Sequence, residues 1–341
     1  MELPKRDRRP RRRQVNNLQQ LIYILSAILV IALVIAISLS GKDTTPEPQL
    51  QATTPTQSSS ATAPTSSSVI PPSSVITQPT TLPSETFPPT TAPPATQPGK
   101  EYIGNLYTRA ELEALDSTMI TYGAGSKTDS QNRPTYALSL DKQYEKYDAH
   151  FIGPDNGKVY LTYNVTYEHE GNVQKTLDIL KAKNVKVVFF IDRGFARVYP
   201  DLVRQIINDG HILANHCNTH PDLPTLPIDK IVNQITNLHD YILENFGYEM
   251  RLFRPPSGYF SEQVWAIAQS LGYRSYNWSF TYLDWDTSKQ PNPTSTLSKM
   301  VNALHSGAIY QLHAISSTNA AILEDFIDQA RAAGYEFELL P

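Results

Sequence analysis

The chain contains a single cysteine, Cys217, among its 341 residues, so it cannot form an internal disulfide. One unpaired thiol neither supports nor excludes a location outside the cytoplasm. Positive charge is also scarce beyond the amino terminus. The first thirteen residues carry seven Lys or Arg and two acids, and removing their net +5 from the whole-chain −4 leaves about −9. Because nucleic-acid binding needs a basic surface, this balance argues against a nucleic-acid partner.

Charged residues are absent from the nineteen-residue run Leu21–Leu39, which is apolar except for one Tyr and two Ser. A helix of this length spans ~28 Å, enough to cross the hydrocarbon core of a bilayer. The basic segment 1–20 precedes the run, so we expect a cytoplasmic tail, a transmembrane signal anchor at 21–39 and a single-pass protein of the cell membrane whose domain is extracytoplasmic. A cleaved signal peptide is the alternative, because small residues flank Leu39.

Large apolar residues are rare between residues 40 and 100, where Pro, Thr, Ser and Gln dominate and thirteen of the 26 prolines lie. Such a segment cannot bury enough apolar area to offset the entropy of ordering. Proline keeps the chain extended, so we interpret 40–100 as a disordered, semi-rigid stalk. Disorder without a spacing role is the alternative, and both interpretations place a domain boundary near residue 100.

The remaining part is long enough for one α/β domain. Residues 101–157 look like an irregular lead-in, whereas strand and helix patterns alternate about seven times in 158–341. The continuous apolar run Val185–Ile191 is typical of a strand covered on both faces, and Pro200–Asn208 of a helix. We expect about seven parallel strands closed as a distorted (β/α) barrel. An open doubly wound sheet is the alternative, although no Gly-rich phosphate loop follows the first strand.

Polar side chains follow several of the predicted strands. They are Asn164, Asp192, His216, His220, Arg254, Asp284, Trp285 and His313. Each alone fits a surface or packed residue, but in a barrel the carboxyl ends of the strands share one face. The sequence therefore predicts a site on that face.

His216 and His220 lie four residues apart, directly after the apolar strand that ends at Ala214. Imidazole is a common ligand of zinc, and on a turn or short helix two rings at this spacing can face the same point. This spacing predicts half of a metal site. Two unrelated loop histidines are the alternative.

Several separate motifs occur in a fixed order from about residue 122 to 339. They are Tyr-Gly-x-Gly from Tyr122, Tyr144–Asp148, His216-Cys-Asn-Thr-His220-Pro-Asp-Leu, Phe253-Arg-Pro-Pro-Ser-Gly-Tyr-Phe-Ser261, Asp284-Trp285 and Gly307-Ala-Ile-Tyr-Gln-Leu-His313. This series resembles the polysaccharide deacetylases that carry the NodB homology domain, carbohydrate esterase family 4. It is most similar to the muramic-acid and peptidoglycan N-deacetylases of the delta-lactam-forming type.

The resemblance implies a fold, an activity and a partner. Residues 158–341 would form a polysaccharide deacetylase-like domain that acts on cell-wall glycan. The family's enzymes are metal-dependent N-deacetylases, hydrolases of non-peptide carbon–nitrogen bonds, and zinc is the expected metal. The sequence identifies no protein partner.

The resemblance also implies roles for residues. His216 and His220 match the two metal histidines, and His313 matches the general acid that protonates the leaving amine. Asp284 matches the carboxylate that orients this histidine, and Arg254 matches the residue that holds the catalytic base. Retained groove residues, including Tyr259 and Trp285, would bind sugar.

The first motif departs from the family pattern of Thr-Phe-Asp, then Asp or Asn, then Gly. Here the run is Thr162-Tyr163-Asn164-Val165-Thr166. Asn164 stands at the base position, where an amide has no useful basicity, and Val165 stands at the third-ligand position, where an alkyl group cannot bind a metal. Loss of a base costs roughly 10²–10⁴ in rate, and we expect metal binding to be weak or lost.

Nearby ionisable residues offer a rescue. Asp192 ends the neighbouring strand, and Glu168 and His169 lie in the loop that follows Val165. Our hypothesis is nevertheless a membrane-anchored pseudoenzyme that binds or organises cell-wall glycan. The alternative is an active metal-dependent N-deacetylase of peptidoglycan amino sugars with substitute ligands.

Overall fold

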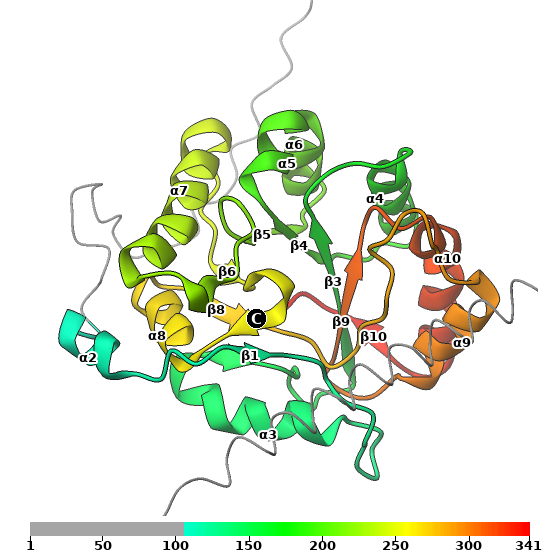
Figure 1. The fold of residues 1–341 in the computed structure, drawn as a ribbon. Coiled ribbons are helices and arrows are strands. Elements are labelled where there is room, and N and C mark those ends of the chain that lie inside the picture. The colour runs from blue at the N-terminus through cyan, green and yellow to red at the C-terminus, as the bar shows by residue number, and fades with distance from the viewer. Residues whose placement is uncertain (1–105) are drawn as a thin grey trace, which may run out of the picture. The chain divides into compact units, whose positions relative to one another are not determined.

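The computed structural model describes residues 106–341 (Figure 1). The predicted cytoplasmic tail, the membrane anchor at 21–39 and the linker at 40–100 lie outside the described residues. Within 106–341, no helix combines the length and the apolar character that a bilayer span requires.

A curled sheet of parallel strands forms the centre of the domain. Its strands are β2 (Ala149–His150), β3 (Lys158–Val165), β4 (Val188–Ile191), β5 (Ile212–Asn215), β6 (Leu252–Phe253), β8 (Arg274–Tyr276), β9 (Ala308–His313) and β10 (Glu336–Phe337). A separate antiparallel pair joins β1 (Ile120–Thr121) to β7 (Tyr259–Phe260).

The longest of these strands, β3, organises the sheet. It pairs with β9 along one edge, and with β4 and β10 near opposite ends of its other edge. The order then runs through β4, β5, β6 and β8. Past β8, Phe280 forms a parallel bridge to Tyr310 of β9, so the curled sheet meets its own other side. This arrangement fits the predicted distorted (β/α) barrel, with eight strands in place of about seven.

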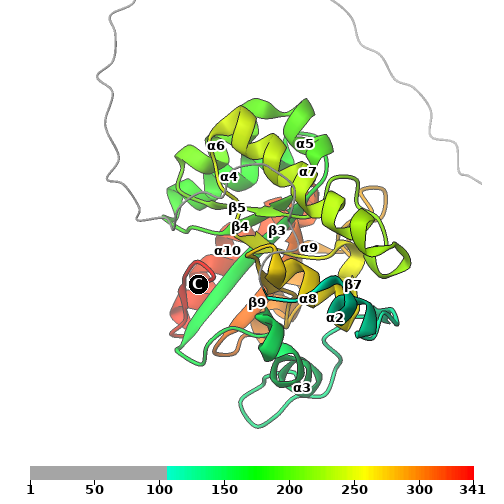
Figure 2. The same cartoon turned by 90° about the vertical axis from the view of Figure 1, so that its left-hand side faces the viewer.

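Helices surround the strands, as Figures 1 and 2 show. They are α2 (Arg109–Ala114), α3 (Thr135–Tyr144), α4 (Asn172–Ala182), α5 (Arg193–Val198), α6 (Pro200–Asn208), α7 (Ile228–Phe246), α8 (Glu262–Ser270), α9 (Pro293–Asn302) and α10 (Ser317–Ala332). Short 3₁₀ turns occupy Glu145–Tyr147, Leu223–Thr225 and Pro256–Gly258. Because helices cover the outside and side chains fill the inside, every residue of β4 is buried.

Local sequence signals set several of these boundaries. Pro200 occupies the first turn of α6, where its missing N–H costs nothing. Ser261 caps α8 by accepting a hydrogen bond from the Val264 N–H at 3.3 Å. Gly247 ends α7 in the left-handed region that glycine adopts without strain.

The lead-in is more regular than expected. Its helix α3 buries only Ala137, Leu140 and Tyr144, a face too sparse to stand out in the sequence. Its strand β2 has two residues, too few for a visible alternation, yet it pairs with β8 at the edge of the sheet. Residues 106–157 therefore complete the same fold as the residues that follow them.

Candidate functional site

The ends of four strands converge, as the sequence predicted. Asn164 is the penultimate residue of β3 and His313 is the last residue of β9, and the two are partners in the register. His216 and Arg254 each follow a strand, β5 and β6, whose last residues also pair. The site thus takes its side chains from segments that lie far apart in the sequence but meet at one edge of the sheet.

A cavity of about 680 Å³ lies over these strand ends. Its lining residues are Asn164, Thr166, Tyr167, His216, His220, Ser257, Gly258, Tyr259, Trp278, Thr281, Tyr282, Leu283, Trp285, Lys299, Gln311, His313 and Ile315. None of these described residues is an Asp or a Glu. Gly258 has φ +68°, and a Cβ there would lie 2.5 Å from the Trp278 ring, so this wall requires glycine.

Arg254 is fully buried beneath the cavity and holds Asn164. Its Nη1 donates to Asn164 Oδ1 at 3.0 Å and to Thr162 Oγ1 at 2.9 Å, and its other donors reach two backbone carbonyls. The guanidinium also lies 4.0 Å from the centroid of the Phe190 ring. Burial lowers the pKa of Arg254 well below its ordinary value. Each of these acceptors is neutral, which is unusual for a buried guanidinium.

The imidazole of His216 is prepared to act as an acceptor. Its Nδ1 lies 2.8 Å from the Arg254 carbonyl oxygen, which can only accept, so Nδ1 carries the hydrogen. Its Nε2 is buried and has no hydrogen-bond partner. Burial, followed by the nearby His220, lowers the pKa of His216, which keeps the ring neutral at pH 7. The ring centroid of His220 lies 5.0 Å away, and desolvation lowers its pKa as well.

This arrangement provides two imidazoles for a metal but lacks the expected third donor. Val165 is 1% exposed and packs in the core, and it does not line the cavity. In the described part of the chain, no group of three or more His, Cys, Asp or Glu side chains could hold a metal ion. Catalytic zinc sites normally use three protein ligands. The donor set therefore does not fit a complete site of that kind.

The three residues considered for rescue have other partners. The Asp192 carboxylate caps α5 by accepting from the Phe195 N–H at 2.7 Å, and burial raises its pKa. Glu168 Oε2 accepts from the Val173 N–H at 3.0 Å, whereas its Oε1 is buried without a hydrogen-bond partner. His169 Nε2 lies 4.0 Å from Glu170 Oε1. None of the three lines the cavity.

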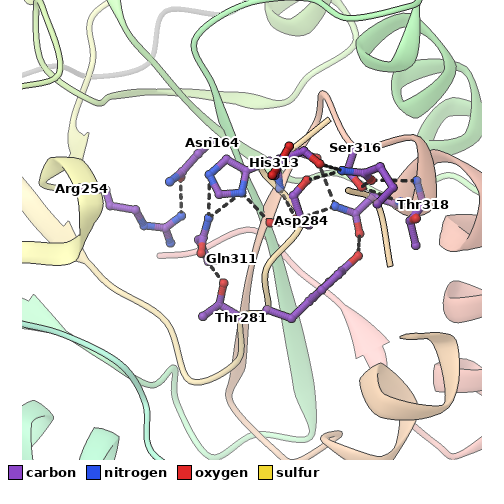
Figure 3. A network of polar contacts seen from close by, with 12 residues as sticks. Asn164, Arg254, Thr281, Asp284, Gln311, His313, Ser316 and Thr318 are labelled. Carbon is purple, nitrogen blue, oxygen red and sulfur yellow. Dashed lines mark hydrogen bonds and ion pairs between the residues drawn. The ribbon is translucent and has the colours of Figure 1, made fainter. Parts of the chain in front are cut away.

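His313 and Asp284 form a hydrogen-bonded pair, which Figure 3 shows. His313 Nδ1 lies 2.7 Å from Asp284 Oδ1, and the His313 backbone N–H donates to Oδ2 at 2.7 Å. Asn319 Nδ2 donates to the same Oδ2, also at 2.7 Å. The fully buried carboxylate thus fixes the imidazole and leaves Nε2 on the cavity side. This is the geometry expected of an oriented acid–base histidine.

Exposed apolar side chains form one rim of the cavity. Trp285 is 57% exposed, Leu283 78% and Tyr167 41%, and Tyr259 is half-buried beside them. Large apolar groups usually leave water unless a ligand covers them. Aromatic faces on a polar cavity suit the apolar faces of sugar rings.

Backbone strain also gathers at this site. Cys217, His220 and Ser257 all have positive φ, between 56° and 73°, although none is glycine. Such conformations cost about 1–3 kcal/mol each and persist where the surrounding structure enforces them. The loop that carries the two histidines is therefore held in a fixed shape.

Gln311, Thr281 and Lys299 are among the cavity residues that the sequence did not identify. Gln311 lies 3.4 Å from both ring nitrogens of His313 and accepts from the Thr281 hydroxyl, as Figure 3 shows. Gln311 points inward from the middle of β9, so the alternation of that strand was the signal that could have found it. Lys299 comes from α9, whose sequence pattern only marks its buried face.

The chain is similar to known proteins in both sequence and fold. The sequence model of the family described as polysaccharide deacetylase matches residues 152–276. The peptidoglycan-N-acetylmuramic acid deacetylase PdaA of Bacillus subtilis is 34% identical over 231 residues, which cover 67% of this chain and 87% of PdaA. Its solved structure, a family 4 carbohydrate esterase, has a TM-score of 0.62 at 32% identity and covers 66% of this chain and 96% of that one.

A second solved structure concerns an impaired relative. It is a mutant of a family 4 carbohydrate esterase pseudoenzyme, described as having restored enzymatic activity, and its wild type comes from Bacillus anthracis. It is 28% identical to this chain with a TM-score of 0.53, and the match covers 56% of this chain and 69% of the mutant. The relatives thus include proteins named as deacetylases and a protein named as a pseudoenzyme.

Proposed function

The chain belongs to the polysaccharide deacetylase family, and from this premise we propose that it binds cell-wall glycan while its own deacetylase chemistry is impaired. The family is generally metal-dependent, and named relatives of this chain act on peptidoglycan. A cell-wall glycan is therefore the proposed ligand. An extracytoplasmic domain on a membrane anchor at 21–39 is part of the proposal, and it is supported by the basic tail and the apolar run alone.

One observation is the main support for impaired deacetylase chemistry. Arg254 donates its hydrogen bond to an amide oxygen at residue 164, and no Asp or Glu among the described residues lines the cavity. An amide cannot take up a proton from water, so the position offers no general base. Val165 adds a second deficiency, because its buried alkyl group gives His216 and His220 no third donor to act with.

The rest of the site supports binding. The Asp284–His313 pair, the cavity and the rim formed by Trp285 and Tyr259 are all present. An exposed tryptophan beside a polar cavity is typical of a ligand-binding groove. In this proposal, the protein therefore still binds glycan although its catalysis is impaired.

The alternative is an active N-deacetylase with substitute ligands. The unpartnered Nε2 of His216 and the intact His313–Asp284 pair favour it. One experiment separates the two functions: purified full-length protein is mixed with peptidoglycan, and bound protein and released acetate are both measured. Binding without acetate supports the proposal. Acetate released at an enzyme-like rate and abolished by a chelator supports the alternative, and absence of both binding and acetate release contradicts both.

A further inference from the structure

A second cavity of about 880 Å³ adjoins the site. It lies between the loop of the lead-in, residues 124–134, and α9. Two residues, Thr281 and Lys299, line both cavities, so the two spaces meet at a shared wall. A ligand that extends from the site toward α9 must pass these two side chains.

Charge in the two cavities is unbalanced. Neither cavity is lined by an Asp or a Glu among the described residues, and Lys299 is their one permanently charged lining residue. Asp284 is fully buried behind His313 and is committed to its own donors. The buried Arg254 adds positive charge beneath Asn164. In a chain with a net charge of −4, this region attracts an anion.

Lys299 is placed to meet such an anion. Its side chain is exposed and has no carboxylate within ion-pair distance in the described part of the chain. Its Nζ lies 5.9 Å from the ring centroid of Phe280 and 5.7 Å from that of Tyr282. These rings keep the ammonium group over the junction, and all three of its donors remain available to a ligand.

The second cavity itself suits a sugar. Hydroxyl groups of Ser126, Thr128, Ser295 and Ser298 line it, and its remaining wall includes the apolar ring of Phe280. The Ser295 and Ser298 hydroxyls donate to backbone carbonyls at 3.2 and 3.1 Å, which leaves them able to accept from a sugar hydroxyl. A cavity with a few polar groups and an apolar wall is the usual form of a small-molecule site.

We propose that the second cavity is an extension of the glycan site, and that Lys299 binds a carboxylate carried by an amino sugar at the junction. The ligand class is an acidic amino-sugar polymer long enough to occupy both cavities. This inference rests on the proposed glycan binding. It adds a carboxylate on the glycan, the residue that binds this carboxylate, and the direction in which the polymer runs.

The first test compares two glycan probes with the full-length protein. One is an oligomer of neutral N-acetylated amino sugars, and the other is a peptide-free glycan of equal length in which alternate sugars carry a carboxylate. Wild type should bind the acidic probe about tenfold more tightly than the neutral probe. A hydrogen bond to a charged group contributes enough binding free energy to lower the Kd by about this factor. Lys299→Gln should abolish the preference, and Lys299→Arg should keep most of it.

Lys289→Gln is the matched control, because this exposed lysine lines neither cavity and its loss changes the net charge equally. A preference that falls equally in both Gln variants is general electrostatics and overturns the role of Lys299. Equal binding of both probes by wild type overturns the acidic ligand but leaves glycan binding intact. Failure to bind either probe removes the proposed function itself.

The second test concerns the direction of the polymer. Ser298→Trp places a large ring in the second cavity only, and should weaken binding of long glycans several-fold while leaving a disaccharide unaffected. Gln329→Trp, on the exposed face of α10, is the control for an added surface tryptophan. Unchanged affinity for long glycans in a folded Ser298→Trp protein contradicts the extended site.

Discussion

The guanidinium of Arg254 donates a hydrogen bond across 3.0 Å to the side-chain oxygen of Asn164. Both residues are buried, and the other acceptors around the guanidinium are a hydroxyl and backbone carbonyls. Asn and Asp have nearly the same shape, so a carboxylate at residue 164 would fit the same space. The site has the form of an ion pair in which one partner has lost its charge.

Asn164→Asp should therefore stabilise the domain by about 1–2 kcal/mol at pH 7, since a hydrogen bond between charged groups is stronger than a neutral one. The Arg254 charge lowers the pKa of the new carboxyl below its unfolded value of about 3.9. The gain is present above that unfolded pKa and is lost as pH falls through the folded pKa. Thermal unfolding of both proteins between pH 3 and pH 8 measures it. Equal or lower stability of the variant at pH 7 refutes the pairing.

Trp285→Ala should weaken glycan binding about three- to tenfold without changing stability, because the exposed indole covers a sugar face but little of the core. Binding to peptidoglycan glycan strands and thermal unfolding are measured together. Tyr136→Ala removes an aromatic side chain that is 44% exposed and lines neither cavity, so it serves as the control. Equal losses in the two variants would show that the rim has no specific role.

Zinc should bind weakly, because His216 and His220 provide two donors where a catalytic site uses three. Calorimetry on the metal-free full-length protein measures the affinity, and His216→Ala should remove what binding there is. Tight stoichiometric binding that persists in Glu168→Ala, His169→Ala and Asp192→Ala would mean that a different donor completes the site.

The proposed anchor at 21–39 makes a separate prediction about topology. Protease added to intact cells should remove the domain and leave a small membrane-bound fragment that contains residues 21–39, because the basic tail keeps the amino terminus inside. Immunoblotting against tags at the two ends follows both fragments. A domain protected until lysis refutes the orientation, and a mature chain that starts near Gly41 shows cleavage.

Much of the fold follows from local sequence. The apolar stripe Ile231, Ile235, Leu238 and Ile242 is fully buried on α7, since a helix of this period must cover one face of the sheet. The strand-end rule places Asn164, His216, Arg254 and His313 on one face of the barrel. In the structure, Arg254 contacts both Asn164 and His216, and His313 is the register partner of Asn164. The helical stripe can be recognised within one element, and the shared edge follows from the parallel arrangement of the strands.

Other features depend on tertiary contacts that no local pattern reveals. Asp192 and Glu168 are candidate ligands in the sequence, but their carboxylates instead accept backbone N–H groups at helix starts. The second cavity exists because residues 124–134 fold back against α9, where Asn132 Nδ2 donates to the Asn302 carbonyl at 2.9 Å. Lys299 lies over the rings of Phe280 and Tyr282, which are distant from it in sequence.

We propose that this protein keeps the scaffold and the acid side of the site and has lost the base and the third metal ligand. Restoring both should therefore restore chemistry. Asn164→Asp and Val165→Asp together, with Thr166→Gly if the loop needs a positive φ, rebuild the family's motif. The single changes should do little, because the two groups act on the same water. A mutant of a related family 4 pseudoenzyme is described as having restored enzymatic activity.

Acetate release from peptidoglycan by wild type and by the rebuilt variant, measured side by side with zinc present, is the direct test. We predict that wild type stays near background and that the rebuilt variant is faster by roughly 10² or more, in line with the effect of a positioned base. His313→Ala in the rebuilt background should remove the gain. Wild-type release equal to that of a folded rebuilt variant would contradict the account, because a residue other than those at 164 and 165 would then supply the chemistry.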